Sequence, residues 1–143
     1  MAACRVLLVD DEAGFLDPLL KRLRRRGITT TASNSGEEAL QRIVTEPPDV
    51  VVLDVKMPGM GGLETLREIK RNHPLVEVIM LTGHATVESA IEGMKHGAYD
   101  YLMKPCDFDQ LMEKLNEATA KKREHEAKIL EARATMISLR RGD

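Results

Sequence analysis

Acidic residues stand directly after two short apolar runs of the chain. Asp10 and Asp11 follow residues 6–9, and Asp54 follows residues 50–53. Three carboxylates brought close together repel one another and raise their pKa values unless a cation offsets the repulsion. Mg²⁺ suits such a place because it binds one or two carboxylates together with water and substrate phosphate oxygens. The acids therefore predict a magnesium site, provided that the fold brings the two runs side by side.

A hydroxyl group and an ammonium group follow two later apolar runs. Thr82 is succeeded by Gly83, and Lys104 by Pro105. An ammonium is a compact charge suited to a phosphoryl group, and a carboxylate such as Asp54 can act as a nucleophile and form an acyl phosphate. Each residue alone is ordinary loop material. Together, in this order, they indicate phosphoryl transfer, in which positioning and charge neutralisation do most of the catalysis.

The elements that must position these residues alternate along the chain. Apolar runs predict five strands, of which the second is weaker and suits an outer position: residues 6–9, 28–32, 50–53, 76–81 and 99–103. Segments with helical spacing lie between them. Strands that are apolar throughout are buried on both faces, which predicts an α/β fold with a parallel sheet between helices. In such sheets ligands bind at the carboxyl ends of the strands.

Four apolar stripes predict the helices that cover the sheet. They are Phe15, Leu16, Leu19, Leu20 and Leu23; Leu40, Ile43 and Val44; Leu63, Leu66 and Ile69; and Val87, Ala90, Ile91 and Met94. Gly97 follows the last stripe and ends that helix. Ser35 and Glu38 predict a capping box before the second helix. Pro18 lies inside the first stripe and removes a backbone hydrogen bond, so that helix either begins late, near Asp17, or is bent.

Four motifs of the chain resemble the receiver domain of two-component response regulators. They are LLVDDE at residues 7–12, VVVLDVKMPGMGG at 50–62, IMLTGHA at 79–85 and GAYDYLMKP at 97–105. The resemblance covers roughly residues 4 to 120. It implies a flavodoxin-like (βα)5 three-layer sandwich whose parallel sheet has the strand order 2-1-3-4-5.

The resemblance implies a metal site and a phosphoacceptor. Asp54 matches the aspartate that is phosphorylated, and Asp10 and Asp11 match the acidic pair. Asp11 and Asp54 are expected to contact Mg²⁺ directly, and the backbone carbonyl of Lys56 to complete the site. Lys56 and His84 match two variable positions at the mouth of the pocket, which tune autodephosphorylation. We expect His84 to face solvent in a loop rather than to bind a metal, because no second histidine lies near it in the motifs.

The resemblance also implies the parts of a switch. Thr82 matches a hydroxyl that turns inward to the phosphoryl group, and Lys104 matches the lysine that pairs with that group. The bond from Lys104 to Pro105 resembles the family's cis peptide. Tyr101 matches the switch aromatic, which is outward in the resting form and inward in the active form. The proline and glycines that follow Asp54 are expected to shape the loop over the pocket.

The function predicted from these residues is that of a phosphoacceptor receiver. A histidine kinase or phosphotransfer protein would donate the phosphoryl group to Asp54, and the face formed by helix four, strand five and helix five would then change its protein contacts. The protein would not be an enzyme beyond its own phosphotransfer and autodephosphorylation.

Two other function classes compete with this reading. A haloacid dehalogenase-type hydrolase also uses an aspartate at the end of a strand together with Mg²⁺. That class needs a second aspartate two residues after the nucleophile, where this chain has Lys56. A receiver-like binding module that no longer takes phosphate would lack part of the pocket. Every pocket residue of the motif set is present here, which argues against that class.

The composition agrees with a cytoplasmic domain. Apolar residues make up 43% and charged residues 31% of 143, the net charge is −2, and aromatic residues are only 3%. These values favour no nucleic-acid or membrane partner. Cys4 and Cys106 form no metal-ligand spacing and are expected to be free thiols, with Cys106 a small buried apolar residue.

The last residues extend beyond the expected receiver at 1–120. Residues 121–143 lack proline, have a glycine only at Gly142, and are rich in Ala, Glu, Lys and Arg, so the fifth helix is expected to run on. Leu111, Leu115, Ala118, Ile129, Ala132, Met136 and Leu139 fit a four-three spacing, which Lys122 and His125 interrupt. A solvated helix or linker and a dimerising coiled coil both remain open. Two identities of the chain also remain open. It is either a stand-alone receiver, which could also form a homodimer through helix four, strand five and helix five, or the receiver part of a longer sigma54-type activator.

Overall fold

The computed structural model describes residues 4–142 of the chain, and residues 1–3 and 143, at the outer ends of the two predicted segments, lie outside the description. The strands are β1 (Arg5–Val9), β2 (Thr29–Ser33), β3 (Val50–Leu53), β4 (Glu77–Thr82) and β5 (Asp100–Met103). The helices are α1 (Ala13–Arg25), α2 (Gly36–Thr45), α3 (Gly62–Asn72), α4 (Val87–Lys95) and α5 (Phe108–Arg141). Neighbouring strands are all parallel in the order β2-β1-β3-β4-β5, which confirms the predicted sandwich.

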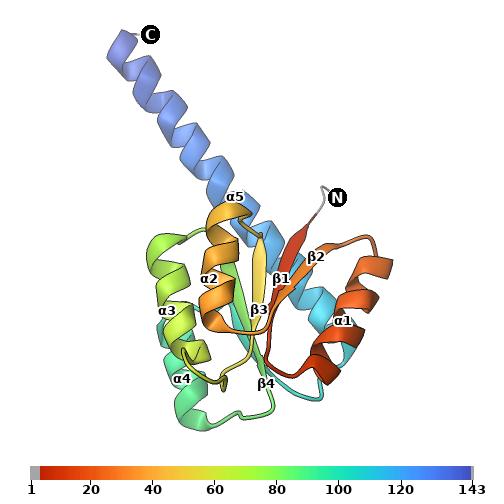
Figure 1. Cartoon of the computed structure of the whole chain (residues 1–143). Helices are drawn as coiled ribbons and strands as arrows, with labels where there is room; N and C mark the ends of the chain where they lie inside the picture. Colours follow the sequence, from red (N-terminus) through yellow and green to blue (C-terminus); the bar gives the residue numbers. More distant parts are fainter. Residues whose placement is uncertain (1–3, 143) are drawn as a thin grey trace.

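The two-residue period of the strands divides the core into two layers. In β1, Val6 and Leu8 point to one face of the sheet, and Leu7 and Val9 point to the other. The strands β3 and β4 divide in the same way. Helices α1 and α5 cover the first face, and α2, α3 and α4 cover the second (Figure 1). This two-sided burial is why the strands are apolar throughout.

The register of the central strands brings the chemical residues together. Val9 of β1 lies opposite Leu53 of β3, so Asp10 and Asp54 leave the sheet side by side. The Asp54 amide donates to the Val9 carbonyl at 3.0 Å. This pair of strands is the point at which the strand order reverses, where α/β sheets open a crevice.

The apolar stripe predicted for α4 does not face the core, and that part of the prediction is wrong. Val87, Ile91 and Met94 are 74%, 59% and 48% exposed. The buried residues of this helix are instead Ser89 and Gly93. The spacing located the helix correctly, but small residues form its inner face because the ring of Tyr101 from β5 packs close against Gly93.

Two local predictions at helix starts also need correction. α1 begins at Ala13 and continues through Pro18, so the late start near Asp17 is wrong, while a bend stays a prediction. The Leu16 amide donates to the Glu12 carbonyl at 2.9 Å, so helical hydrogen bonding begins before the proline. At α2 the Ser35 hydroxyl accepts from the Glu38 amide at 3.1 Å, as predicted, but the Glu38 carboxylate lies near Arg42 rather than returning to Ser35. The second half of the predicted capping box is therefore missing.

The fifth helix continues past residue 120, as predicted, and projects from the sandwich (Figure 1). Its first turns pack on the sheet through Leu111, Leu115 and Ala118. Residues 127–142 are exposed. In the part of the chain that the structure describes, no helix is both long and apolar enough to cross a membrane.

Candidate functional site

Asp54 stands at the end of β3 with one oxygen that has no partner. Asp54 is buried, with only 1% of its surface exposed. One carboxylate oxygen, Oδ1, accepts from the Val55 amide at 2.9 Å, whereas Oδ2 is buried without a hydrogen bond. A buried carboxylate oxygen left unpaired is costly, so this atom marks a place prepared for a cation or a reacting group.

Glycine lets the chain close tightly behind Asp54. The Gly62 amide donates to the Val55 carbonyl at 2.8 Å, and a Cβ at Gly62 would lie 1.9 Å from the Asp54 carbonyl oxygen. Any side chain there would collide with the backbone of the acid. Gly62 is thus explained by this close approach, which starts α3 while leaving the Asp54 carboxylate in place.

The carboxylates that crowd around Asp54 differ in part from those predicted. Ligand atoms of Asp10, Glu12 and Asp54 lie within 4.8 Å of one another. Asp11, predicted to be in this group, is exposed and lies in the wall of the outer pocket. The turn between β1 and α1 accounts for the difference, because the Glu12 amide donates to Asp10 Oδ1 at 2.9 Å and brings Glu12 over the site. Sequence reasoning missed Glu12 as a member, although it directly follows the acidic pair.

Lys104 bridges two of these acids. Its Nζ donates to Asp10 Oδ2 at 2.6 Å and to Glu12 Oε1 at 3.5 Å, and it lies 4.0 Å from the centre of the Phe15 ring. Among residues 4–142 no hydrogen bond joins Lys104 to Asp54. The Lys104–Pro105 bond is cis, as the motif predicted. Phe15 was assigned only to the core, because its place in the apolar stripe gave no sign of this contact.

The pKa values of the bridging pair follow from burial and from the contact itself. Burial raises the pKa of Asp10, and this effect outweighs the lowering by the Lys104 hydrogen bond. Burial acts to lower the pKa of Lys104, but the bond to Asp10 and the nearby acids outweigh it, so the Lys104 pKa is raised. Lys104 therefore stays charged at neutral pH and balances the acids beside it.

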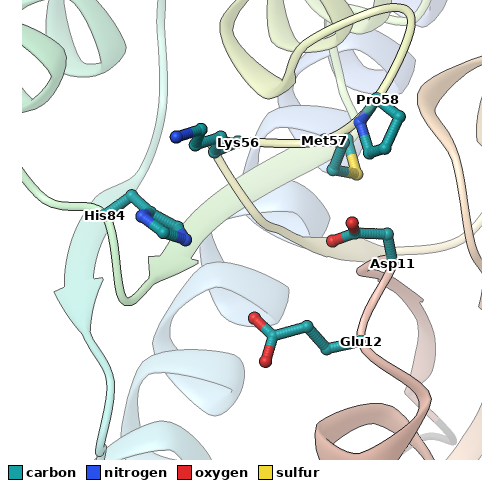
Figure 2. Close-up of a pocket in the computed structure, with 6 residues that line it drawn as sticks. All are labelled: Asp11, Glu12, Lys56, Met57, Pro58 and His84. Atoms are coloured by element: carbon teal, nitrogen blue, oxygen red, sulfur yellow. The ribbon is translucent and has the colours of Figure 1, made fainter.

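A pocket of about 430 Å³ opens over the acids. Asp11 and Glu12 lie on one side of it, and Lys56 and His84 lie across from them on the loops after β3 and β4 (Figure 2). Lys56 and His84 are exposed. The pocket is lined by Asp11, Glu12, Lys56, Met57, Pro58 and His84. A partner can thus reach the acids from solvent between charges of opposite sign.

Thr82, the last residue of β4, and Tyr101, the second residue of β5, are not hydrogen-bonded to Asp54. Thr82 is fully buried, and its hydroxyl accepts from the His84 amide at 3.0 Å. Tyr101 is half-buried, and its hydroxyl lies 2.6 Å from Ser89 Oγ. Sequence reasoning missed Ser89, which lies in the first turn of α4, because its contact with Tyr101 joins residues that are distant in the sequence. The predicted site residues therefore form one group around Asp54 and a second beside α4.

The two cysteines lie outside both groups. Cys4 is buried and Cys106 is half-buried, and both are free thiols. The prediction that Cys106 is buried is wrong, because its place just after Lys104-Pro105 leaves Sγ near the start of α5 with partial exposure. Burial and the Asp107 carboxylate raise the pKa of Cys106, which makes its thiolate scarce at neutral pH and agrees with a role other than redox chemistry.

The donor set around Asp54 fits a hard divalent cation. It consists of carboxylate oxygens, the ligands that Mg²⁺ prefers, and it includes the unpaired, buried Oδ2 of Asp54. A cation placed here would relieve the repulsion among the acids. The arrangement can therefore hold a metal beside a nucleophilic carboxylate, with an ammonium group within reach.

The sequence profile of the family described as the response regulator receiver domain matches residues 6–116. The chain belongs to this family. Receiver domains generally bind Mg²⁺ at an acidic pocket, and the cluster in this receiver is compatible with that. As a receiver domain of a two-component response regulator, the protein acts in phosphorelay signalling.

Curated relatives of this receiver are longer regulators. Transcriptional regulatory protein ZraR of Klebsiella oxytoca is 37% identical over 134 residues, which cover 94% of this chain and 30% of the relative. DNA-binding transcriptional regulator NtrC of Escherichia coli strain K12 is 39% identical over 105 residues, which cover 73% of this chain and 22% of the relative. The receiver thus spans less than a third of the length of these proteins.

Solved structures share the fold. A response regulator receiver domain protein (CheY-like) from Methanospirillum hungatei JF-1 has a TM-score of 0.83 and 30% identity, covering 87% of this chain and 99% of that one. NtrX from Brucella abortus has a TM-score of 0.81 and 33% identity, covering 90% of this chain and 30% of that one. The likeness therefore extends both to isolated receivers and to a longer regulator.

Proposed function

We propose that Asp54 accepts a phosphoryl group from a phosphohistidine of a histidine kinase or phosphotransfer protein. The observation that carries the proposal is the buried, unpaired Oδ2 of Asp54 within the acid cluster, whose member Glu12 also lines a pocket open to solvent. A carboxylate oxygen of Asp54 forms the new bond to phosphorus while the phosphorus–nitrogen bond breaks, and the electron pair of that bond stays on the imidazole. The product is an acyl phosphate on Asp54.

Asp10, Asp11, Asp54 and the backbone carbonyl of Lys56 are the groups proposed to hold Mg²⁺. Bound there, the metal would neutralise negative charge on the phosphoryl oxygens. The proposal keeps Asp11 as a direct ligand because it lines the pocket next to the buried acids. Glu12, which lies within reach of Asp10 and Asp54, is a further carboxylate that can act through water.

Two residues of this chain are proposed to recognise the phosphoryl group. Lys104 exchanges its contacts with Asp10 and Glu12 for the new negative charge on Asp54. The Thr82 hydroxyl accepts from the His84 amide, so its own proton is available for a phosphoryl oxygen. These contacts exist only after transfer and would stabilise an active conformation.

The output surface proposed is the face formed by α4, β5 and α5. It exposes Val87, Ile91 and Met94 on α4 and Met103 on β5, of which Met103 is 63% exposed. Exposed apolar groups of this kind mark protein contacts. A second copy of this chain is one partner that we propose, and it would bind through this face or through the extension of α5. Neither dimer contact would involve nucleic acid or membrane. The receiver would catalyse only its own phosphotransfer and autodephosphorylation. The transfer would take place in the cytoplasm.

The alternative for the output is that this receiver works within a longer transcriptional regulator. Its support is the length of the relatives, one of which is described as a DNA-binding transcriptional regulator, together with a helix that continues past the fold. In that setting α5 would connect the receiver to further domains of the sigma54-activator type.

The phosphoacceptor assignment is tested with acetyl phosphate and Mg²⁺. Intact-protein mass spectrometry should find one added phosphoryl group on the wild type and none on Asp54→Asn, and removal of Mg²⁺ with EDTA should prevent the addition. Asp17→Asn, which changes an exposed acid of α1, is the matched control and should be phosphorylated normally. Undiminished phosphorylation of Asp54→Asn would sink the assignment.

A further inference from the structure

Tyr101 packs in a slot on the inner face of α4. A Cβ placed at Gly93 would lie 3.4 Å from Cδ2 of the Tyr101 ring and 3.6 Å from the Met80 side chain. Ser89 stands one helical turn before Gly93 on the same face and is 9% exposed. The two small residues make room for the ring, so the position of Tyr101 depends on which side chains α4 turns inward.

The Ser89 hydroxyl has a full set of partners that includes Tyr101. A serine hydroxyl has one proton and two lone pairs. It lies 3.1 Å from the Thr86 carbonyl, to which it donates, and 3.0 Å from both the amide and the hydroxyl of Thr86. The Tyr101 hydroxyl lies 2.6 Å from the same oxygen, and either hydroxyl can donate in that contact. The same oxygen therefore joins the first turn of α4 to Tyr101 of β5.

The loop before α4 is tied at both ends. At its start the His84 amide donates to the Thr82 hydroxyl at 3.0 Å. At its end Thr86 caps the helix, since its hydroxyl accepts from the Ser89 amide at 3.0 Å. A movement of Thr82 thus moves His84 and the loop, and the loop ends at Thr86, which is bonded to Ser89, the residue that contacts Tyr101.

We propose that Ser89 is the positioning residue that couples Tyr101 to the loop between β4 and α4. The inference rests on the proposed phosphoacceptor function, because Thr82 moves only when Asp54 carries a phosphoryl group. Displacement of the loop changes the distance between Ser89 and the Tyr101 hydroxyl, and the ring responds. A serine that served only to cap α4 would leave Tyr101 independent of the loop.

Fluorine NMR can follow Tyr101 alone, because the chain has only two tyrosines. The parent protein is Tyr99→Phe carrying fluorotyrosine, and the probe is beryllofluoride with Mg²⁺, which mimics a phosphoryl group on a carboxylate. The bound beryllofluoride has fluorine signals of its own, so binding and the response of Tyr101 are read in one spectrum. We expect the Tyr101 signal to shift on binding in the parent, and in Ser89→Ala to shift by less than half as much while the bound signals persist.

Ser35→Ala is the matched control, since it removes a capping hydroxyl from α2, where Ser35 caps in the same way. It should leave the Tyr101 response unchanged. Bound signals with an equal Tyr101 response in Ser89→Ala, or with no response in the parent, would overturn the inference alone. Absence of bound signals in the parent would overturn the phosphoacceptor proposal and this inference with it.

A double-variant cycle separates coupling from capping. Ser89→Ala and Tyr101→Phe should change the beryllofluoride dissociation constant by the same factor, roughly three- to tenfold, which one hydrogen bond supplies. The double variant should change it by no more than either single variant, because both remove one contact. Tyr101→Phe leaves the cap of α4 intact. The coupling would be contradicted if the factors of the two single variants multiplied in the double variant, or if neither single variant changed the dissociation constant.

Discussion

Asp10 and Lys104 decide the charge balance of the site at the scale of single residues. Asp10 is 3% exposed and Lys104 Nζ lies 2.6 Å from it, so each charge is desolvated and depends on the other. Glu12, whose side chain is 59% exposed, contributes less because water screens it. The pair keeps the acids together while Asp54 waits for a cation or a phosphoryl group.

Removal of Lys104 should therefore destabilise the receiver when no metal is present. We expect Lys104→Ala to lower the free energy of unfolding in EDTA by roughly 3 kcal/mol, because Asp10 keeps a buried charge without its partner. Added Mg²⁺ should stabilise this variant more than the wild type, since the cation replaces the lost ammonium. Urea denaturation with and without Mg²⁺ measures both effects. Lys128→Ala, at a side chain that is 68% exposed, is the control and should change the free energy by less than about 0.5 kcal/mol.

At the scale of elements, two acids hold α5 where it leaves the sheet. Glu77 opens β4, is 2% exposed, and contacts Lys70 and Lys121, each at 3.2 Å. Asp49 stands just before β3 and contacts Lys122 at 3.1 Å and the start of β1 through the Arg5 amide at 2.8 Å. These contacts reach residues 121 and 122, just past the receiver boundary predicted at 120, and that boundary stays a prediction.

Weakening these contacts should loosen the helix beyond them. We expect Glu77→Gln to lower the free energy of unfolding by about 2 kcal/mol, because the buried charge that accepts a hydrogen bond from Lys70 and pairs with Lys121 is lost. Amide exchange in residues 120–130 should become faster, because α5 opens more often where its contacts with the sheet are weakened. Glu124→Gln is the control, because Glu124 pairs with exposed Lys128 along the same helix. Exchange rates that match in the two variants would show that Glu77 has no part in holding α5.

At the scale of the whole molecule, the sandwich and the extension of α5 depend on different contacts. The core lies between the helices and the sheet, whereas residues 127–142 are exposed. Isolated helices of this length are marginal in water, so the extension relies on the packed part of α5 as its nucleus. Ile129, Leu130 and Met136 remain exposed on it, at 37%, 64% and 52%.

A chain that ends after residue 126 should keep the receiver fold. Its thermal midpoint should stay within a few degrees of that of the full chain, because no core contact is removed, and phosphorylation from acetyl phosphate should persist. Light scattering of both chains tests the extension as a dimer contact. A dimeric full chain with a monomeric truncated chain would support that role, and equal masses would count against it.

Much of the site could be predicted because parallel strands place their carboxyl ends along one edge. The apolar run 50–53 became β3 without a change of bounds, and Asp54 therefore had to stand beside Asp10. For the helix that begins at Ala13, Pro18 left both a late start and a bend open in the sequence, and the bond from the Leu16 amide to the Glu12 carbonyl excludes the late start. Periodicity finds an apolar face, but it does not say what covers that face, as α4 shows.

The sequence by itself determined which polar residues follow each strand and the alternation of strands and helices that builds the sheet, because both follow from local spacing along the chain. Only the tertiary structure decided that Glu12 rather than Asp11 turns toward Asp54, that Lys104 rests on Asp10, and that Ser89 meets Tyr101. Those choices depend on turn geometry and on contacts between residues far apart in the chain. The energy of such contacts exists only when the elements have packed, so no local pattern records it.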